Sequence, residues 1–451
     1  MFPAFAELPE PLTAVYGTPE VNEPVPLYRG PVELSADGKM HRKDAEIRLA
    51  WLPAPLVELR VDDFFSTRLI GTDDEWRVYV PGRSTAMPVI WTRATPSVPG
   101  SGEQGNAVGR TFEEGQLAAA RVRYVDFHLA NAPAYIGHSV RYGHGGLRSA
   151  RALAESGAWR VTLDAIHDWT VNEKRRRLRE SGGYAITHVG RLERADGQPF
   201  EAGDAAAPLD AFGWLVSFCR GAWSFPMLLV AEDADTGERY EVWRCPRIDA
   251  DARHRSWFNE LSIEGFGAYP GVVAKLADST WNEPVRHALH WYIVCNKPGP
   301  VSIEGAIVLQ QAAFELLAWT LLVEERKVLS DDGAQKLPAS DRIRLMLSTC
   351  GIPLGIPSDL DDLLKVAKAE NWQDGPHATT EIRNALVHAS PKKRARIFGH
   401  GHGPRTDAWT LGQWYLELIL LRLFDYTGHY SNRLRRGAWQ GTEVEPVPWA
   451  K

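Results

Sequence analysis

The hydrophobic pattern of this chain changes its period along the sequence, and this change constrains the fold more than any single residue does. Up to about Gly197, short runs of alternating apolar and polar residues are bounded by Gly, Pro, Asp and Asn. Such alternation predicts strands of an antiparallel sheet or sandwich. After Ser302 the apolar residues fall at helical spacing, which predicts four or five helices packed as a bundle. We therefore expect an α+β protein, with a strand-rich N-terminal region and an all-α C-terminal bundle.

Seven runs carry the strand pattern: Ile47–Trp51, Leu56–Val61, Trp76–Val80, Val89–Arg93, Arg121–Phe127, Trp159–Leu163 and Tyr184–Leu192. In the helical part, residues that favour helix N-caps stand at Ser302, Ser340, Ser358 and Asp407. These boundaries predict a sensor or regulatory domain at 1–200, a connecting α/β segment at 201–300, a helical bundle at 301–440 and a tail at 441–451.

Charge and cysteine usage exclude several classes of protein. The 451 residues include 51 Lys and Arg against 57 Asp and Glu, a net charge of -6, so a polyanion would need a local basic patch. The four cysteines form no CxxC pair, which argues against a structural zinc site and fits a reducing compartment. The N-terminus lacks a basic region before an apolar core. We expect a cytoplasmic protein without a membrane anchor.

The segment around Arg383 and His388 carries the pattern Arg-Asn-x-x-x-His within a helical context. Pro391 disfavours helical geometry at Ser390 and so predicts that the helix ends there, with His388 in its last turn. Histidine can hold or release a proton near neutral pH, as acid and base catalysis requires. Asn384 and His388 are four residues apart and share one helix face, whereas Arg383 must reach round with its long side chain.

These groups suit cleavage of RNA by attack of its own 2′-hydroxyl. A histidine moves the protons, and an arginine stabilises the charged phosphate. The reaction needs no metal or cofactor. The spacing alone is weak evidence, because about one Arg-x4-His pair is expected by chance in a chain of this composition. Arg123 and His128 have the same spacing in a strand-like run, and we set that pair aside.

The segment from about Ser302 to Tyr430 resembles a HEPN domain, and within that superfamily it is most similar to Apea-like and YopA-like bacterial proteins. The resemblance rests on Ile382–His388 and on the helical patterns at Ile303 and Phe314. It implies a metal-independent endoribonuclease that leaves 2′,3′-cyclic phosphates, acts as a homodimer, and serves as a toxin or antiphage-defence effector. Arg383 and His388 would be catalytic, with Asn384 orienting them.

Four other polar clusters were considered as functional or as structural features. The run containing Lys392, Lys393, Arg394 and Arg396 could contact RNA phosphates or form a solvated loop. We expect the denser run Lys174–Arg179 to be a solvated or acid-paired surface. His400 and His402 lack a third ligand, which disfavours a metal site. We expect Glu304, Gln311 and Glu315 to form a polar stripe satisfied within the bundle.

Two functions follow from these patterns. The first is an endoribonuclease that binds RNA, with tRNA among the candidates, and whose N-terminal region meets a trigger or an antitoxin partner. The alternative is a non-catalytic RNA-binding or dimerisation module with an N-terminal ligand-sensing domain.

Overall fold

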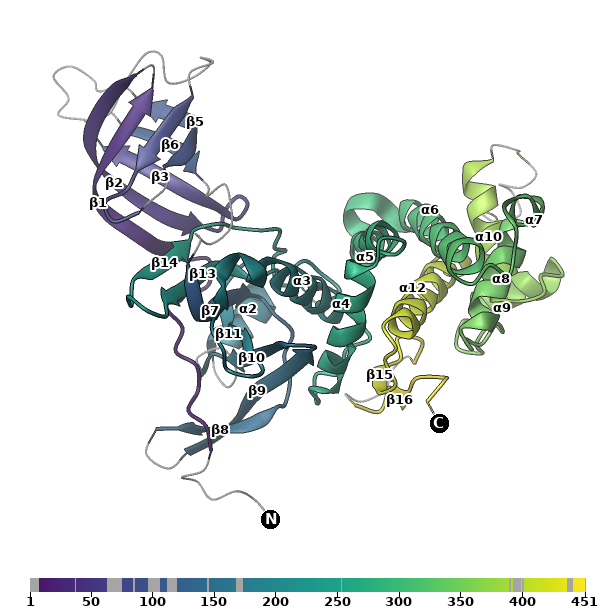
Figure 1. The fold of residues 1–451 in the computed structure, drawn as a ribbon. Helices are drawn as coiled ribbons and strands as arrows, with labels where there is room; N and C mark the ends of the chain where they lie inside the picture. Colours follow the sequence, from purple (N-terminus) through teal and green to yellow (C-terminus); the bar gives the residue numbers. More distant parts are fainter. Residues whose placement is uncertain are drawn as a thin grey trace.

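The computed structural model describes residues 8–450 except 37, 63–74, 84–85, 96–105, 112–119, 144–145, 168–172, 253, 389–390, 392–398, 400 and 436–440. Three parts follow one another in space as they do in sequence (Figure 1): a strand barrel, a central sheet with helices against it, and a group of helices that ends near the C-terminus. The expected fold class, strand-rich and antiparallel first and mostly helical afterwards, is confirmed.

The first part is a closed barrel of six antiparallel strands in the order β1-β2-β3-β6-β5-β4. The strands are β1 (Val25–Ala36), β2 (Lys39–Ala50), β3 (Leu56–Asp62), β4 (Trp76–Tyr79), β5 (Met87–Thr95) and β6 (Asn106–Thr111). Alternate residues such as Val32 and Leu34 are buried, because successive side chains of a strand point to opposite faces.

The second part is an antiparallel sheet with the order β14-β13-β7-β11-β10-β9-β8, and β12 pairs with β7 beside this path. Its elements are β7 (Arg121–Ala130), β8 (His138–Tyr142), β9 (Gly146–Ser156), β10 (Trp159–Ala165), α2 (Glu173–Ser181), β11 (Ile186–Arg194), β12 (Phe200–Glu201), α3 (Ala206–Arg220), β13 (Met227–Asp233) and β14 (Arg239–Val242). Helix α3 packs on the sheet through Phe212, whose ring centroid lies 5.7 Å from that of Phe127. Because β13 pairs with β7, residues that we expected in a connecting segment belong to the central sheet.

The third part is helical. It contains α4 (Tyr269–Ala277), α5 (Asn282–Cys295), α6 (Pro298–Trp319), α7 (Asp331–Lys336), α8 (Ala339–Thr349), α9 (Asp361–Ala369), α10 (Gly375–Val387) and α12 (Gly403–Leu423), followed by the hairpin strands β15 (His429–Ser431) and β16 (Val444–Pro446). Helix α12 is buried along most of its length. The hairpin reaches back toward the central part, since Ser431 N donates a hydrogen bond to Trp257 O at 2.6 Å.

Of the expected N-cap residues, Ser302 caps its own helix, whereas Asp407 caps a different one. Ser302 has φ 62° at a kink near the start of α6, and its hydroxyl accepts a hydrogen bond from Gly305 N, so it caps the helix as predicted. Asp407 does not begin a helix. It lies inside α12, and its carboxylate accepts from the backbone N–H groups of Asp362 and Leu363, which caps α9 instead.

The longest apolar helix is part of the protein interior. Among the described residues one helical stretch, Ser302–Glu325, is long and apolar enough to cross a membrane, and 67% of its most apolar window is buried. The four cysteines are free; three are buried and Cys245 is half-buried. Burial raises the pKa of the Cys295 thiol to about 12, as expected for an inert thiol.

His128, which shares the Arg-x4-His spacing, is a structural histidine on β7. Its Nε2 accepts hydrogen bonds from Val15 N and Tyr16 N at 3.1 Å, so Nδ1 carries the proton that Leu228 O accepts. Burial lowers the pKa of His128 from 6.5 to about 4. Setting this pair aside was therefore justified by its surroundings.

The lowered pKa of His128 predicts a loss of stability in mild acid. The unfolded chain binds this proton near pH 6.5 and the folded chain only near pH 4, so stability is present above pH 6.5 and falls toward pH 4, by roughly 3 kcal/mol from this one group. Thermal melts across this range should show a smaller decrease for His128→Gln than for the wild type. Equal decreases would mean that other groups govern the acid sensitivity.

Candidate functional site

The predicted motif lies where helix α10 ends. Asp374 caps the start of this helix by accepting a hydrogen bond from His377 N at 3.0 Å. The helix ends at Val387, and His388 is its C-cap residue, with its N–H bonded to Asn384 O at 2.9 Å. The predicted end of the helix is thus correct to within one turn.

The described contacts of this motif join Arg383 and Asn384 to each other and to Glu381. Arg383 is half-buried and donates to Asn384 Oδ1 at 3.3 Å, while Asn384 donates to Glu381 Oε1 at 3.2 Å. His388 is exposed. Among the described contacts, no side-chain hydrogen bond joins His388 to Arg383 or Asn384. Asn384 therefore orients Arg383 but not His388.

The structure describes some of the other predicted polar clusters and not others. Lys392, Lys393, Arg394, Arg396 and His400 lie outside the described residues. His402 Nδ1 lies 2.9 Å from Arg405 Nη2, and within the described ranges no three His, Cys, Asp or Glu side chains are grouped as metal ligands. The stripe on α6 is bonded inside the helical part: Glu315 pairs with Arg342, and Glu304 pairs with Arg405.

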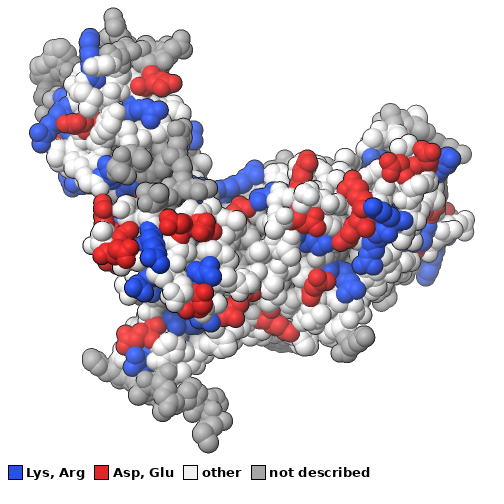
Figure 2. All heavy atoms as spheres, in the orientation of Figure 1, with Lys and Arg blue, Asp and Glu red and all other residues white. Residues whose placement is uncertain are grey.

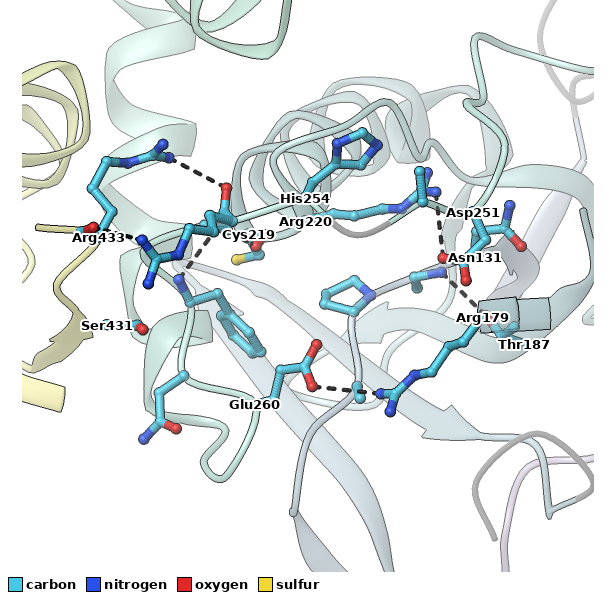
Figure 3. Close-up of a pocket in the computed structure, with 18 of the residues that line it drawn as sticks. Asn131, Arg179, Thr187, Cys219, Arg220, Asp251, His254, Glu260, Ser431 and Arg433 are labelled. Carbon is cyan, nitrogen blue, oxygen red and sulfur yellow. Dashed lines mark hydrogen bonds and ion pairs between the residues drawn. The ribbon is translucent and has the colours of Figure 1, made fainter. Parts of the chain in front are cut away.

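A cavity lies elsewhere, between the central sheet, α2 and the segment that carries the C-terminal hairpin. Its volume is about 450 Å³, within the range of roughly 300–1,000 Å³ that is common for small-molecule sites. Figure 3 shows Ser431 and Arg433 on one side of it, and Thr187 and Arg179 on the other. The cavity thus joins segments about 250 residues apart in the sequence.

Basic residues outnumber acidic ones on the wall of this cavity. Its described lining includes the charged residues Arg175, Arg179, Arg220, Arg255 and Arg433, against Asp251, Glu260 and Glu443. Elsewhere positive and negative side chains mix over the face of the molecule shown in Figure 2. The cavity is therefore a local positive site on a chain whose net charge is negative.

Three of these arginines hold the surrounding backbone. Arg220 donates to the carbonyl oxygens of Trp223 and Ala250 at 2.6 and 2.9 Å. Arg255 donates to Arg433 O at 2.9 Å, and Arg433 donates to Arg255 O at 3.2 Å. Such bonds fix the two segments to each other, so these three arginines shape the cavity and add to its positive potential.

Arg433 also connects the cavity to the interior of the helical part. Its guanidinium binds both carboxylate oxygens of Glu417 on α12, with Nε 2.8 Å from Oε2. Glu417 Oε1 also accepts a hydrogen bond from the Tyr292 hydroxyl on α5 at 2.8 Å. The side chains of Arg433 and Glu417 are 3% and 0% exposed, so this network is fully desolvated.

Arg175 and Arg179 form the remaining positive wall. They are four residues apart on α2, and both line the cavity, because residues at this spacing share a helix face. Burial lowers the pKa of Arg175, and the nearby Arg179 lowers it further. Arg179 Nη2 lies 3.5 Å from Glu260 Oε2, a long ion pair that leaves other N–H groups available.

The same helix presents its other arginines to solvent. Arg176 pairs with Glu173 and with Glu180, and Arg177 pairs with Glu173 and Glu20. The expectation of a solvated or acid-paired surface holds for these two residues and also for Arg179, which pairs with Glu260 and whose side chain is 51% exposed. It did not place Arg175 and Arg179 at a cavity, although their spacing within the run Lys174–Arg179 could have indicated a second face.

The titratable groups beside the arginines are shifted by burial as well. Burial, and then the charge of Arg220, lowers the pKa of His254 to about 4, so this imidazole is neutral at pH 7. Burial raises the pKa of Asp251, although the guanidinium of Arg220 lies 3.9 Å away and acts in the opposite direction. His254 therefore adds no positive charge to the cavity at pH 7, and the positive charge there comes from the arginines.

Two protein families match the chain, one over the central part and one over the helical part. Residues 118–253 match the YopA central domain, and residues 278–445 match the YopA C-terminal domain. The chain is also similar to the SPbeta prophage-derived uncharacterized protein YopA of Bacillus subtilis (strain 168), with 28% identity over 444 residues, 95% of this chain and 96% of that protein. No solved structure matches.

The assignment to the HEPN superfamily is therefore wrong, because the matches to the helical part are to the YopA C-terminal domain and not to a HEPN family. A motif of six residues is short, and its Arg-to-His spacing arises by chance in a chain of this length. The cavity is lined by residues from both matched regions. Arg175, Arg179 and Asp251 belong to the central match, while Ser431 and Glu443 belong to the C-terminal match.

Proposed function

We propose that this chain is a non-catalytic ligand sensor whose cavity binds a small anionic molecule between its central and C-terminal domains. The observation that carries this proposal is the position of Arg175 and Arg179, two arginines on one helix face that both line the cavity. The proposal keeps ligand sensing from the alternative that the sequence suggested, but its site lies between the central and C-terminal parts of the chain instead of in the N-terminal region.

Electrostatics favours an anion there. Like charges at this helical spacing cost about 0.2–0.5 kcal/mol on an exposed helix, and the burial of Arg175 adds to the cost. Glu260 is 3.5 Å from Arg179, and Asp251 is 3.9 Å from Arg220, so both ion pairs are long. Arginine recognises phosphate and carboxylate groups by paired N–H donors, so an anion at this wall would be attracted by both Arg175 and Arg179.

A ligand at this position would also connect two domains. Contacts to α2 and to the segment around Ser431 would involve both family matches, and ligand sites are frequent at such interfaces. Because a ligand that binds only the folded chain stabilises it, occupancy should strengthen the attachment of the helical part to the sheet.

Thermal unfolding of the full chain tests this function. Inorganic phosphate should raise the Tm in a saturable manner, while chloride at the same ionic strength should not, because a specific anion binds the native state. Equal effects of the two salts would reduce the phosphate response to general screening and would remove the support for an anion site.

The ion pair between Arg179 and Glu260 predicts that one substitution will strengthen phosphate binding. Glu260 competes for Arg179, so Glu260→Gln should tighten phosphate binding by about 2- to 5-fold, in line with a surface ion pair of up to about 1 kcal/mol. Titration calorimetry of the variant and the wild type measures the ratio. Weaker binding by the variant would place Glu260 among the ligand contacts.

The endoribonuclease stays a prediction of the sequence. If the cavity is the functional site, total RNA incubated with the chain in EDTA should yield no 2′,3′-cyclic phosphate ends that depend on His388. Cleavage that falls about 10²- to 10⁴-fold in His388→Ala would instead identify an acid or base catalyst. Arg383→Ala is the matched second variant, since both residues would be needed for the reaction.

A further inference from the structure

The wall that faces α2 carries an acceptor rather than a donor. Glu443 lines the cavity, and its Oε1 accepts a hydrogen bond of 3.5 Å from the Ser431 hydroxyl. Its Oε2 is buried and has no hydrogen-bond partner among the described residues. A buried acceptor left unsatisfied costs about 1–3 kcal/mol, and more when it is charged. Glu443 would therefore gain from an N–H or O–H group supplied by a ligand.

Glu443 can present either oxygen to such a group. The terminal torsion of glutamate has a broad minimum, and the bond to Ser431 is long enough to be exchanged at little cost. A carboxylate accepts hydrogen bonds from hydroxyl or amino groups and repels a second anion. The anionic part of a ligand should therefore lie on the α2 side, away from Glu443.

The α2 side favours a doubly charged group over a singly charged one. Two guanidinium groups, Arg175 and Arg179, face the cavity there, and a phosphate monoester carries about -1.5 to -2 charge at pH 7 with three strong acceptor oxygens. A carboxylate offers one charge and two oxygens. The pair of arginines matches the monoester better in both charge and number of acceptors.

From these two walls we infer that the ligand is a phosphate monoester that also carries hydroxyl or amino groups, such as a nucleoside monophosphate or a sugar phosphate. Its phosphate lies between Arg175 and Arg179, and a donor group on its other end binds Glu443. The cavity of about 450 Å³ has room for both parts. This inference rests on the proposed anion site and specifies what that site takes.

Titration calorimetry on the full chain tests the ligand class with AMP, glucose 6-phosphate, inorganic phosphate, adenosine and glucose as probes. At least one of the two esters should bind about 10-fold or more tightly than inorganic phosphate, because a hydrogen bond to a charged group contributes about 1.5–3 kcal/mol. Adenosine and glucose should bind far more weakly than their phosphates. The preferred ester distinguishes a nucleotide from a sugar phosphate.

The variant Glu443→Gln tests the proposed ligand class separately from the proposed anion site. The variant should lose most of the preference for the ester, by about 5- to 10-fold, and should bind inorganic phosphate at least as well as the wild type. Glu180→Gln is the matched control, because Glu180 pairs with Arg176 on the exposed face of α2 and carries the same charge change. The Tm of each variant reports whether the fold is retained.

The contrary outcomes are distinct. Esters that bind no tighter than inorganic phosphate, or an ester preference that Glu443→Gln leaves unchanged, would overturn the ligand class while the anion site stands. Failure of every probe, inorganic phosphate included, would overturn the anion site itself and the ligand class with it.

Discussion

Replacing both Arg175 and Arg179 by methionine is expected to weaken phosphate-ester binding by at least about 100-fold, because each charge-assisted hydrogen bond contributes about 1.5–3 kcal/mol. Methionine keeps the length and helix propensity of the side chain, so α2 should still form. Titration calorimetry measures the loss, and thermal unfolding without ligand checks the fold. Removing one pair of like charges should leave the Tm unchanged or slightly raised.

The same helix supplies the control. Arg176 and Arg177 lie on its exposed face and pair with carboxylates there, so the double variant Arg176→Met with Arg177→Met removes the same charge without touching the cavity. It should bind the ester within about 2-fold of the wild type, the residual effect being long-range and screened by salt. Similar losses in both double variants would mean that general charge, and not the cavity, attracts the anion.

The second large effect concerns stability. Arg433→Met should lower the free energy of unfolding of the helical part by about 3–5 kcal/mol, because it leaves the Glu417 carboxylate buried without a cation. Glu417 is 0% exposed, and the remaining hydrogen bond from Tyr292 cannot replace a charge. Denaturant unfolding followed by circular dichroism at a helical wavelength measures the change.

Two further variants separate the buried pair from general charge effects. Arg435→Met removes an arginine two residues away whose side chain is 48% exposed, and it should cost no more than about 1 kcal/mol. Adding Glu417→Gln to Arg433→Met should recover part of the loss, since a neutral amide is less costly to bury than a charge. A double variant less stable than the sum of the single changes would argue against an uncompensated charge as the cause.

The strand-rich region could be predicted because its signal is local. Each of the seven expected runs overlaps a strand of the structure, and four of them lie entirely within one, since alternation reports directly which residues face the core. Strands β1, β6, β8, β9 and the two-residue β12 were missed. On β9 the exposed residues Leu147 and Leu153 are as apolar as the buried alanines at 150, 152 and 154, so apolar residues stand on both faces and the alternation is hidden.

Asp407 shows the limit of local rules in the helical part. It was expected to cap its own helix, a contact between neighbours in the sequence. The structure uses it to cap α9, about 45 residues earlier. Capping needs only an acceptor at the right place, and packing of α12 against α9 supplies that place in a way that spacing does not reveal.

The candidate site could be predicted only in part for the same reason. The run Lys174–Arg179 was recognised as basic, and its spacing contains the pair that faces the cavity. Whether that face meets solvent or a cavity depends on residues near 131, 254 and 433, which only the tertiary fold brings together. For Arg383 and His388, the sequence predicted the end of the helix to within one turn.

Anomalous diffraction from crystals of the full chain soaked with tungstate, a heavy analogue of phosphate, tests the central claim most directly. The account predicts a peak inside the cavity, within hydrogen-bonding distance of the guanidinium groups of both Arg175 and Arg179, and the loss of that peak when both are methionine. A fully occupied peak elsewhere, with the cavity empty under the same conditions, would contradict it.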